Sequence, residues 1–151
     1  MIKIIYGNLF DSTAEILCHQ CNCQGVMGSG VAAEVKKRYP EVFQAYRHEY
    51  ETKGLELGKV VFVKNLRGQI IANLLGQDKF GYDGQQYTRY DKLQECLDAV
   101  KTVMIEQGFT TVALPYMMSC CRGGGSWDVV FTMITETFKG FDVEIWRLDT
   151  I

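Results

Sequence analysis

The stretch that decides the fold joins a short apolar run to a glycine-rich loop, and it reads Ile16-Leu17-Cys18-His19-Gln20-Cys21-Asn22-Cys23-Gln24-Gly25-Val26-Met27-Gly28-Ser29-Gly30. An apolar run bounded by turn residues is typical of a buried strand. After the loop, Val31, Val35 and Tyr39 have the spacing of one helix face. Glycines let a backbone approach a ligand closely, and a helix N-terminus offers unpaired N–H groups. The stretch therefore predicts strand, loop and helix, with a place that suits a phosphate.

Polar side chains at the end of this buried strand add a second signal. The glycine order is G-x-x-G-x-G, which differs from the dinucleotide and P-loop fingerprints, so the glycines alone specify little. His19, Gln20 and Asn22, however, must either be hydrogen-bonded or face a cleft. In open α/β sheets that cleft lies at the carboxyl ends of the strands. We therefore expect a binding cleft where this strand ends.

Composition restricts the classes of partner. A chain of 151 residues fits one domain, spanning 1–151, and this size buries roughly two thirds of the extended-chain surface. With 16 basic and 18 acidic residues, the net charge of −2 creates no field that attracts nucleic acid or an acidic membrane. No apolar run approaches the about 20 residues of a membrane span. We expect a cytoplasmic monomer without membrane or nucleic-acid partners.

The six cysteines raise the alternatives of disulfides or a metal site. Cys18, Cys21, Cys23 and the pair Cys120-Cys121 do not form the two C-x-x-C clamps of a zinc site. In a reducing cytosol, thiols stay free and pack like small apolar groups. We therefore expect no metal and no cofactor, and a metal-dependent or thiol-dependent protein remains the less favoured alternative.

Strand-like and helix-like runs alternate along the chain. Strands are expected at 1–6, 16–21, 59–64, 69–74, 111–115 and 142–148, and helices at 31–38, 41–51, 89–107 and 127–138. Pro40 separates the first two helices, and Thr88 and Ser126 are the expected N-caps of the last two. A four-residue turn at 65–68 makes its flanking strands a hairpin or neighbours. The alternation predicts an α/β fold whose largely parallel sheet is covered on both faces.

The longest irregular segment, residues 76–87, is a candidate binding loop. Loops of this length in compact domains are usually functional. Its aromatic residues Phe80, Tyr82 and Tyr87 could close over a ligand, or they could dock onto their own domain. Both alternatives stay open on the sequence.

A second glycine-rich loop, Ser119-Cys120-Cys121-Arg122-Gly123-Gly124-Gly125-Ser126-Trp127, repeats the order of strand, glycines and helix N-terminus. Two such loops at neighbouring strand ends would form two backbone nests facing one crevice, as a diphosphate with a sugar on each side requires. Alternatively, the three glycines only serve a tight turn. Arg122 could pair with a phosphate, although solvent exposure is the commoner state of an arginine.

Taken together, these motifs resemble the macrodomain family, whose members bind ADP-ribose. The resemblance rests on Tyr6-Gly7-Asn8-Leu9, on the stretch 16–30 and on the loop 119–127, and the order and spacing of the elements agree over nearly the whole chain. The run 18–23 followed by Met27-Gly28-Ser29-Gly30 is most similar to the branch with terminal ADP-ribose protein glycohydrolase and ADP-ribose 1″-phosphate phosphatase. The resemblance implies a three-layer α/β/α macrodomain-like fold with a mixed, largely parallel central sheet.

The resemblance also implies where an ADP-ribose ligand would lie. Asn8 would hold the adenine amino group, and Leu9 and Phe10 would line the adenine side. Asn22 falls near the distal ribose. The first loop would pass that ribose and the phosphates with Gly28, Ser29, Gly30 and Val31. The second loop would wrap the diphosphate with Ser119, Cys120, Cys121, Arg122, Gly123, Gly124 and Gly125.

Two positions depart from the pattern of the glycohydrolase branch. Gln77 and Gly123 stand where that branch has a catalytic lysine and an aspartate. His19, with an ordinary pKa of about 6.5, could exchange a proton at neutral pH, so His19 and Asn22 are the candidate catalytic residues. The first hypothesis is a hydrolase of an ADP-ribose derivative at the distal ribose, either a 1″-phosphate or an ADP-ribosyl ester such as an ADP-ribosylated protein. The second is an ADP-ribose reader without turnover.

Overall fold

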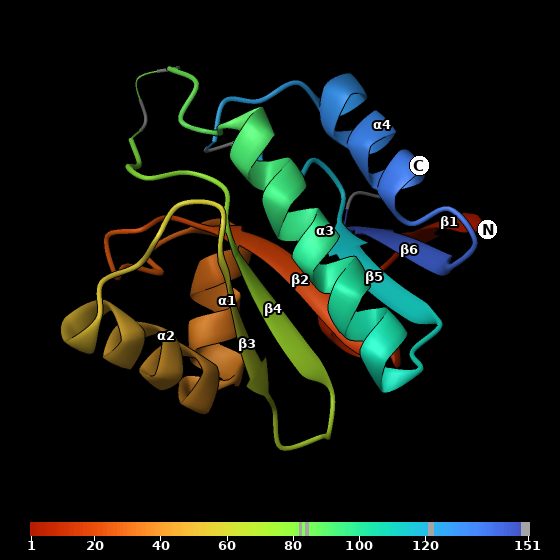
Figure 1. The fold of residues 1–151 in the computed structure, drawn as a ribbon, viewed down its shortest axis with the longest axis horizontal. Helices are drawn as coiled ribbons and strands as arrows, with labels where there is room; N and C mark the ends of the chain where they lie inside the picture. Colours follow the sequence, from red (N-terminus) through yellow and green to blue (C-terminus); the bar gives the residue numbers. More distant parts are fainter. Residues whose placement is uncertain (82, 84, 121–122, 149–151) are drawn as a thin grey trace.

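One six-stranded sheet organises the molecule, and the computed structural model describes residues 1–81, 83, 85–120 and 123–148 (Figure 1). The strand order is β1-β6-β5-β2-β4-β3. The strands are β1 (Ile2–Tyr6), β2 (Ile16–Cys21), β3 (Val60–Lys64), β4 (Ile70–Leu75), β5 (Thr111–Pro115) and β6 (Asp142–Arg147). Neighbours pair in parallel except β3 and β4, which form an antiparallel hairpin. The expected α/β class and mixed, largely parallel sheet are confirmed.

Helices cover both faces of the sheet and complete the expected three layers. They are α1 (Gly30–Arg38), α2 (Pro40–Thr52), α3 (Tyr90–Gln107) and α4 (Trp127–Thr137). Side chains of β2 alternate between two cores: Ile16 and Cys18 are buried with residues of α3 and α4, whereas Leu17 and Cys21 are buried with residues of α1 and α2. Figure 1 shows α3 and α4 in front of the sheet and α1 behind it.

The helix boundaries follow local chemistry, with one exception. Pro40 begins α2 at a position that needs no N–H donor, and Gly108 ends α3 with a left-handed φ of 70°. Ser126 is the N-cap of α4, as predicted. The prediction that Thr88 caps α3 is wrong, because Arg89 is the N-cap and Thr88 instead forms an isolated antiparallel bridge with Gln77. None of the helices within the described ranges is long and apolar enough to cross a membrane.

Candidate functional site

A cleft of about 240 Å³ lies at the carboxyl ends of β5, β2 and β4, which are neighbours in the sheet. Its position agrees with the rule for open α/β sheets. The cleft contains eight of the residues that were predicted to be catalytic or to bind ligand, and these are His19, Asn22, Gly28, Ser29, Gly30, Val31, Ser119 and Gly123. The strand ends and both glycine-containing loops therefore meet at one place.

The first loop brings the start of α1 to the cleft. Ser29 is the N-cap of α1 with extended backbone, and Gly30 begins the helix with a φ of 60°. A side chain in this left-handed region would be strained, although a Cβ at Gly30 would meet no other atom. The unpaired N–H groups of a first helical turn can therefore face a ligand here.

Asn22 is fixed at the rim by its own loop and by α2. Its side-chain oxygen accepts a hydrogen bond from the Gln24 N–H at 2.9 Å, and its amide nitrogen donates to the Val26 carbonyl at 3.0 Å. The buried Tyr46 hydroxyl donates to the Asn22 carbonyl at 2.7 Å. Burial raises the pKa of Tyr46, so its hydroxyl stays protonated. Asn22 thus presents a rigidly held amide to the cleft.

His19 is buried, with 2% of its surface exposed. The Asn73 side-chain nitrogen donates to the Val61 carbonyl at 2.8 Å, so the Asn73 oxygen faces His19, 2.6 Å from Nε2. The imidazole must therefore carry its proton on Nε2. Burial lowers the pKa of His19 to about 4, against the opposing effect of the Asn73 hydrogen bond. With this pKa the imidazole is neutral near pH 7, whereas the sequence suggested the ordinary histidine pKa of about 6.5.

Hydrogen bonds from neighbouring residues hold the second loop and the turn before it in a strained backbone conformation. Met117 and Ser119, neither of them glycine, have left-handed φ values of 63° and 71°. The Gly125 N–H donates to the Ser119 carbonyl at 2.9 Å, and the Gly123 carbonyl accepts from the Thr88 N–H at 2.8 Å. These contacts tie the loop to the segment before α3. Cys121 and Arg122, both predicted to bind ligand, lie outside the described residues.

The loop needs its glycines for packing between loops. A Cβ at Gly123 would come within 2.6 Å of the Ser119 carbonyl, and a Cβ at Gly124 would meet the backbone of Gln85 and Gln86. Gly124 and Gly125 do not line the cleft. Packing between segments therefore explains Gly123 and Gly124, a reason that differs from the tight turn considered on the sequence.

The three residues predicted for the adenine side do not line the cleft. The Asn8 side chain accepts a hydrogen bond from the Phe10 N–H at 2.9 Å and thereby caps the 3₁₀ helix Leu9–Asp11. Leu9 and Phe10 are each 6% exposed, in the core beside α1 and α2. Cys120 is also absent from the lining, because it packs toward the core under α3 and α4.

Several lining residues were not among the predicted catalytic or ligand-binding residues, although for Phe80 the sequence left open both a ligand contact and docking onto its own domain. Gln77 directly follows β4, so the rule of a polar residue at a strand end could have found it. Phe80 and Val26 line the cleft with 47% and 37% of their surfaces exposed. Tyr116 lines it too, with the Arg147 guanidinium 3.8 Å from its ring centroid. No sequence pattern predicted that Tyr116 lines the cleft, because the direction of its side chain depends on the backbone conformation directly after β5.

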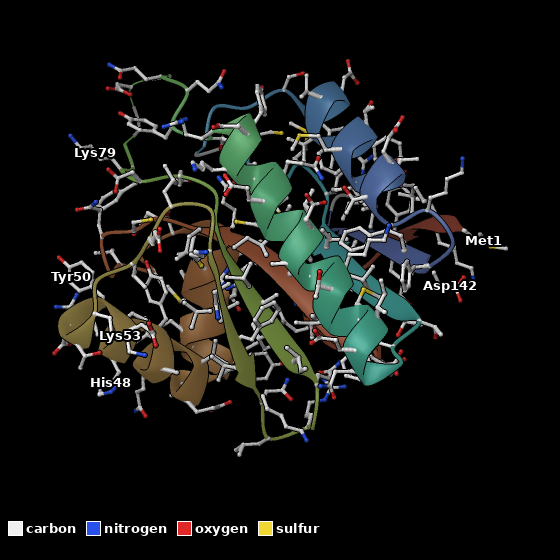
Figure 2. All side chains as sticks on the ribbon, in the orientation of Figure 1. Met1, His48, Tyr50, Lys53, Lys79 and Asp142 are labelled. Carbon is white, nitrogen blue, oxygen red and sulfur yellow. The ribbon has the colours of Figure 1, made fainter. Side chains whose placement is uncertain are left out.

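Electrostatically, the cleft is uncharged over the part of its lining that the structure describes. That lining contains no Asp, Glu, Lys or Arg. Lys79, two residues beyond Gln77, is exposed and points away from the body of the protein (Figure 2).

Burial raises the pKa of Cys23 to about 11 and that of Cys21 well above its ordinary value, so both thiols stay protonated. Among the described residues, no group of three or more His, Cys, Asp or Glu could hold a metal ion.

Comparisons with known proteins agree with this geometry. The sequence model of a family described as Macro domain matches residues 18–134. A DNA ADP-ribosyl glycohydrolase from Mycobacterium tuberculosis is 40% identical over 143 residues, which are 92% of this chain and 39% of that protein. The human ADP-ribose glycohydrolase OARD1 is 26% identical, over 95% of this chain and 88% of its own length. The solved macrodomain of Thermus aquaticus DarG superposes with a TM-score of 0.79, with 26% identity and 99% of both chains covered.

The extent of these matches differs between relatives. The chain spans about two fifths of the length of the DNA ADP-ribosyl glycohydrolases that it matches, with 42% for the Thermus aquaticus protein and 39% for the Mycobacterium tuberculosis protein. It matches the Thermus aquaticus DarG macrodomain from end to end. The match therefore covers a part of the longer glycohydrolases and the whole of the solved macrodomain.

Proposed function

The chain belongs to the Macro domain family, and we propose that its cleft binds ADP-ribose and hydrolyses an ADP-ribose derivative at the distal ribose. The observation that carries the proposal is the meeting of two glycine-containing loops, one of them leading into the N-terminus of α1, at the carboxyl ends of β5, β2 and β4. Helix N-termini and successive backbone amides stabilise phosphate anions. This arrangement fits a diphosphate with a sugar at each end.

In this proposal, backbone groups bind the diphosphate. The described lining offers no cationic side chain, so attraction must come from oriented N–H groups and from the positive end of α1. Gly28 and Ser29 from the first loop and Ser119 and Gly123 from the second are the proposed contacts. Cys120, Gly124 and Gly125, which do not line the cleft, would then act by shaping the second loop.

Asn22 is the proposed catalytic residue that touches the substrate. Its amide is held by the Gln24 N–H and the Val26 carbonyl, so it could orient the attacking water or the leaving oxygen without moving. His19 would contribute as a neutral imidazole bound to Asn73, because a pKa of about 4 removes proton transfer at neutral pH. Catalysis would rest on positioning and electrostatics rather than on acid–base chemistry.

The relatives extend the range of candidate substrates. One relative is named a DNA ADP-ribosyl glycohydrolase and another an ADP-ribose glycohydrolase. For this chain, the candidates are ADP-ribose 1″-phosphate, ADP-ribosyl esters including ADP-ribosylated protein, and ADP-ribosylated DNA.

A reader function is the second candidate, and the uncharged lining favours it. Efficient hydrolysis commonly uses a general acid or base with a pKa near the working pH. Within the described lining, no carboxylate or lysine is present, and Gln77 occupies the place that the resemblance gives to a catalytic lysine. A protein built in this way could hold ADP-ribose without turning it over.

We also propose that residues 1–151 act as one domain and as a monomer in the cytoplasm. The cleft is built from elements of a single chain, and the buried Cys18, Cys21, Cys23 and Cys96 are free thiols, which fits a reducing compartment. Light scattering during size-exclusion chromatography should give one species near 17.2 kDa.

The test is a substrate panel. Purified protein is incubated with ADP-ribose 1″-phosphate, O-acetyl-ADP-ribose, ADP-ribosylated protein and ADP-ribosylated DNA, and the released products are measured by mass spectrometry. We expect release of ADP-ribose from at least one substrate and slower release by Asn22→Ala. The control is Gln107→Ala, which removes an exposed amide at the end of α3. Binding of ADP-ribose without any product would support the reader, and absence of binding at millimolar ligand would overturn both functions.

A further inference from the structure

We propose that Gln20 is a positioning residue that joins the two walls of the cleft, an inference that rests on the proposed function for its effect on ligand. One wall is the second glycine-rich loop with Ser119. The other is the arm, which we define as residues 76–81 and 85–88, between β4 and α3. Both walls contribute lining residues, so their relative position sets the width of the cleft.

The side-chain amide of Gln20 contacts three segments at once. Its nitrogen donates to the Gln77 side-chain oxygen at 2.7 Å and to the Thr88 hydroxyl at 2.8 Å. Its oxygen accepts from the Ser119 hydroxyl at 2.6 Å. Gln77 and Thr88 form the two ends of the arm, and Ser119 begins the second loop. One amide at the end of β2 therefore connects both walls.

The orientation of this amide is fixed by its partners. A hydroxyl has a single proton, and Thr88 donates it to the Ser119 carbonyl at 2.9 Å. Thr88 can then only accept from Gln20, so the nitrogen of Gln20 must face the arm and its oxygen must face Ser119. The Gly123 carbonyl, which accepts from the Thr88 N–H, closes a ring of hydrogen bonds between the walls.

The packing around Gln20 leaves little room for another arrangement. A Cβ at Gly76 would meet the side-chain oxygen of Gln20, and a Cβ at Gly123 would lie 2.9 Å from its nitrogen. Gly76 accepts only glycine unless Gln20 moves, and Gly123 accepts only glycine even then, because the Ser119 carbonyl and the Thr88 hydroxyl also occupy the space of a Cβ. The absence of side chains at these two positions thus allows the Gln20 amide to sit between the walls.

The backbone conformation of Ser119 gives a physical reason for a positioning residue at Gln20. A serine with a φ of 71° is held in a sparsely populated backbone region, which persists only where surrounding contacts over-determine it. Gln20 holds its hydroxyl and Thr88 holds its carbonyl. Without Gln20, Ser119 would lose one of these constraints and the arm would lose its link to β2. The position of the arm relative to the proposed phosphate wall would then depend on the remaining hydrogen bonds from Thr88 to the Ser119 and Gly123 carbonyls.

The experiment compares four variants with the wild type. Gln20→Leu removes the amide, and Thr88→Val removes the hydroxyl with little change in shape. Thr88→Ser keeps the hydroxyl and is the rescue variant. Thr137→Val is the matched control. Thr137 is a buried threonine at the end of α4 that does not line the cleft, and its hydroxyl accepts a hydrogen bond from the Gln94 side-chain amide at 2.8 Å.

Two readouts separate this inference from the proposed function. The first is hydrogen exchange without ligand, at the Thr88 and Gly125 amides, which hold the arm and the second loop. We expect faster exchange at both amides in Gln20→Leu and Thr88→Val, and wild-type exchange in Thr88→Ser and Thr137→Val. The second is calorimetric titration with ADP-ribose, where Gln20→Leu and Thr88→Val should bind at least about fivefold more weakly, as expected for one unsatisfied buried group.

The outcomes are distinguishable. If the wild type does not bind ADP-ribose, the proposed function fails, and the exchange data alone decide whether Gln20 joins the walls. If the wild type binds and Gln20→Leu binds equally well with unchanged exchange, the positioning role is wrong. Equal losses of affinity in Thr137→Val and Thr88→Val would likewise overturn it, because they would reflect stability alone.

Discussion

Asn73 lies directly opposite His19 in the parallel register of β2 and β4, and its side-chain oxygen is 2.6 Å from the imidazole Nε2. Asn73 is fully buried and donates to the Val61 carbonyl on β3. One polar chain therefore runs across three strands under the cleft. Because every group in this chain is paired, the buried histidine is stable as a neutral ring.

The first prediction concerns the pH dependence of stability. The pKa of His19 is about 4 in the folded protein and about 6.5 when unfolded, so the unfolded state binds more protons between these values. The contribution of His19 to stability is therefore fully present above pH 6.5 and is lost as the pH falls toward 4. We expect a loss of roughly 3 kcal/mol between pH 7 and pH 4 from this residue. Urea unfolding at a series of pH values measures it.

His19→Gln is the control for this prediction, because a glutamine amide can still donate to Asn73 but does not titrate. The variant should show a flatter dependence of unfolding free energy on pH between 4 and 6.5. An NMR titration that places the His19 pKa above 6 in the wild type would contradict the prediction.

The second prediction concerns Gly124. Gly124→Ala should destabilise the protein for two reasons: its φ of 71° disfavours a side chain, and the new Cβ would meet the Gln85 backbone. Gly68→Ala is the matched control, since Gly68 has a φ of 84° but open space around it. We expect about 1 kcal/mol of lost stability for the control and more for Gly124→Ala. Thermal unfolding with equal losses in both variants would show that the arm does not pack against this glycine.

The third prediction concerns Phe80. Its side chain is 47% exposed at the cleft, so Phe80→Ala should change the unfolding free energy by less than about 0.5 kcal/mol. Affinity for ADP-ribose should fall, because an aromatic ring on the cleft wall loses its contact with ligand. Leu66→Ala, at the tip of the β3–β4 hairpin, removes another exposed apolar side chain and should leave affinity unchanged. Wild-type affinity in Phe80→Ala would remove Phe80 from the binding surface.

The fourth prediction concerns Tyr46, which is fully buried on α2. Tyr46→Phe removes the hydroxyl that donates to the Asn22 carbonyl, so stability should fall by about 1 to 2 kcal/mol. If Asn22 contacts substrate, affinity or turnover should fall as well. Tyr50→Phe, a half-buried tyrosine on the same helix, is the control and should affect neither. A Tyr46→Phe enzyme with normal turnover would separate Asn22 from the reaction.

Local sequence patterns predicted most of the fold. The strand at 16–21 and the α1 helix that follows its glycine-rich loop needed only an apolar run, glycines and helical spacing. Pro40 and Gly108 set helix boundaries through backbone chemistry that is visible in one residue. The three-layer arrangement followed from alternation of strands and helices, together with the resemblance to macrodomains.

The site was less predictable, because its contacts join residues far apart in the chain. The partner of His19 depends on the register of β2 with β4, which the sequence does not display. Thr88 resembles an N-cap locally, yet its hydroxyl binds the Ser119 carbonyl, 31 residues away. The left-handed backbone of Ser119 had no glycine to signal it. Polar residues at strand ends pointed to the cleft, but their partners required the fold.

The sheet order has a consequence for how the protein folds during synthesis. β1 pairs only with β6 among the described strands, and the Met1 amino group donates to the Phe141 carbonyl at 2.8 Å. Among the described strands, β1 is synthesised before the others and its partner β6 after them, so β1 gains its neighbour in the sheet only when β6 has been made. Until then, its backbone is an unpaired edge that a chaperone or another chain could bind. Such non-local pairing also slows folding, so closure of β1 onto β6 is expected to be a late step.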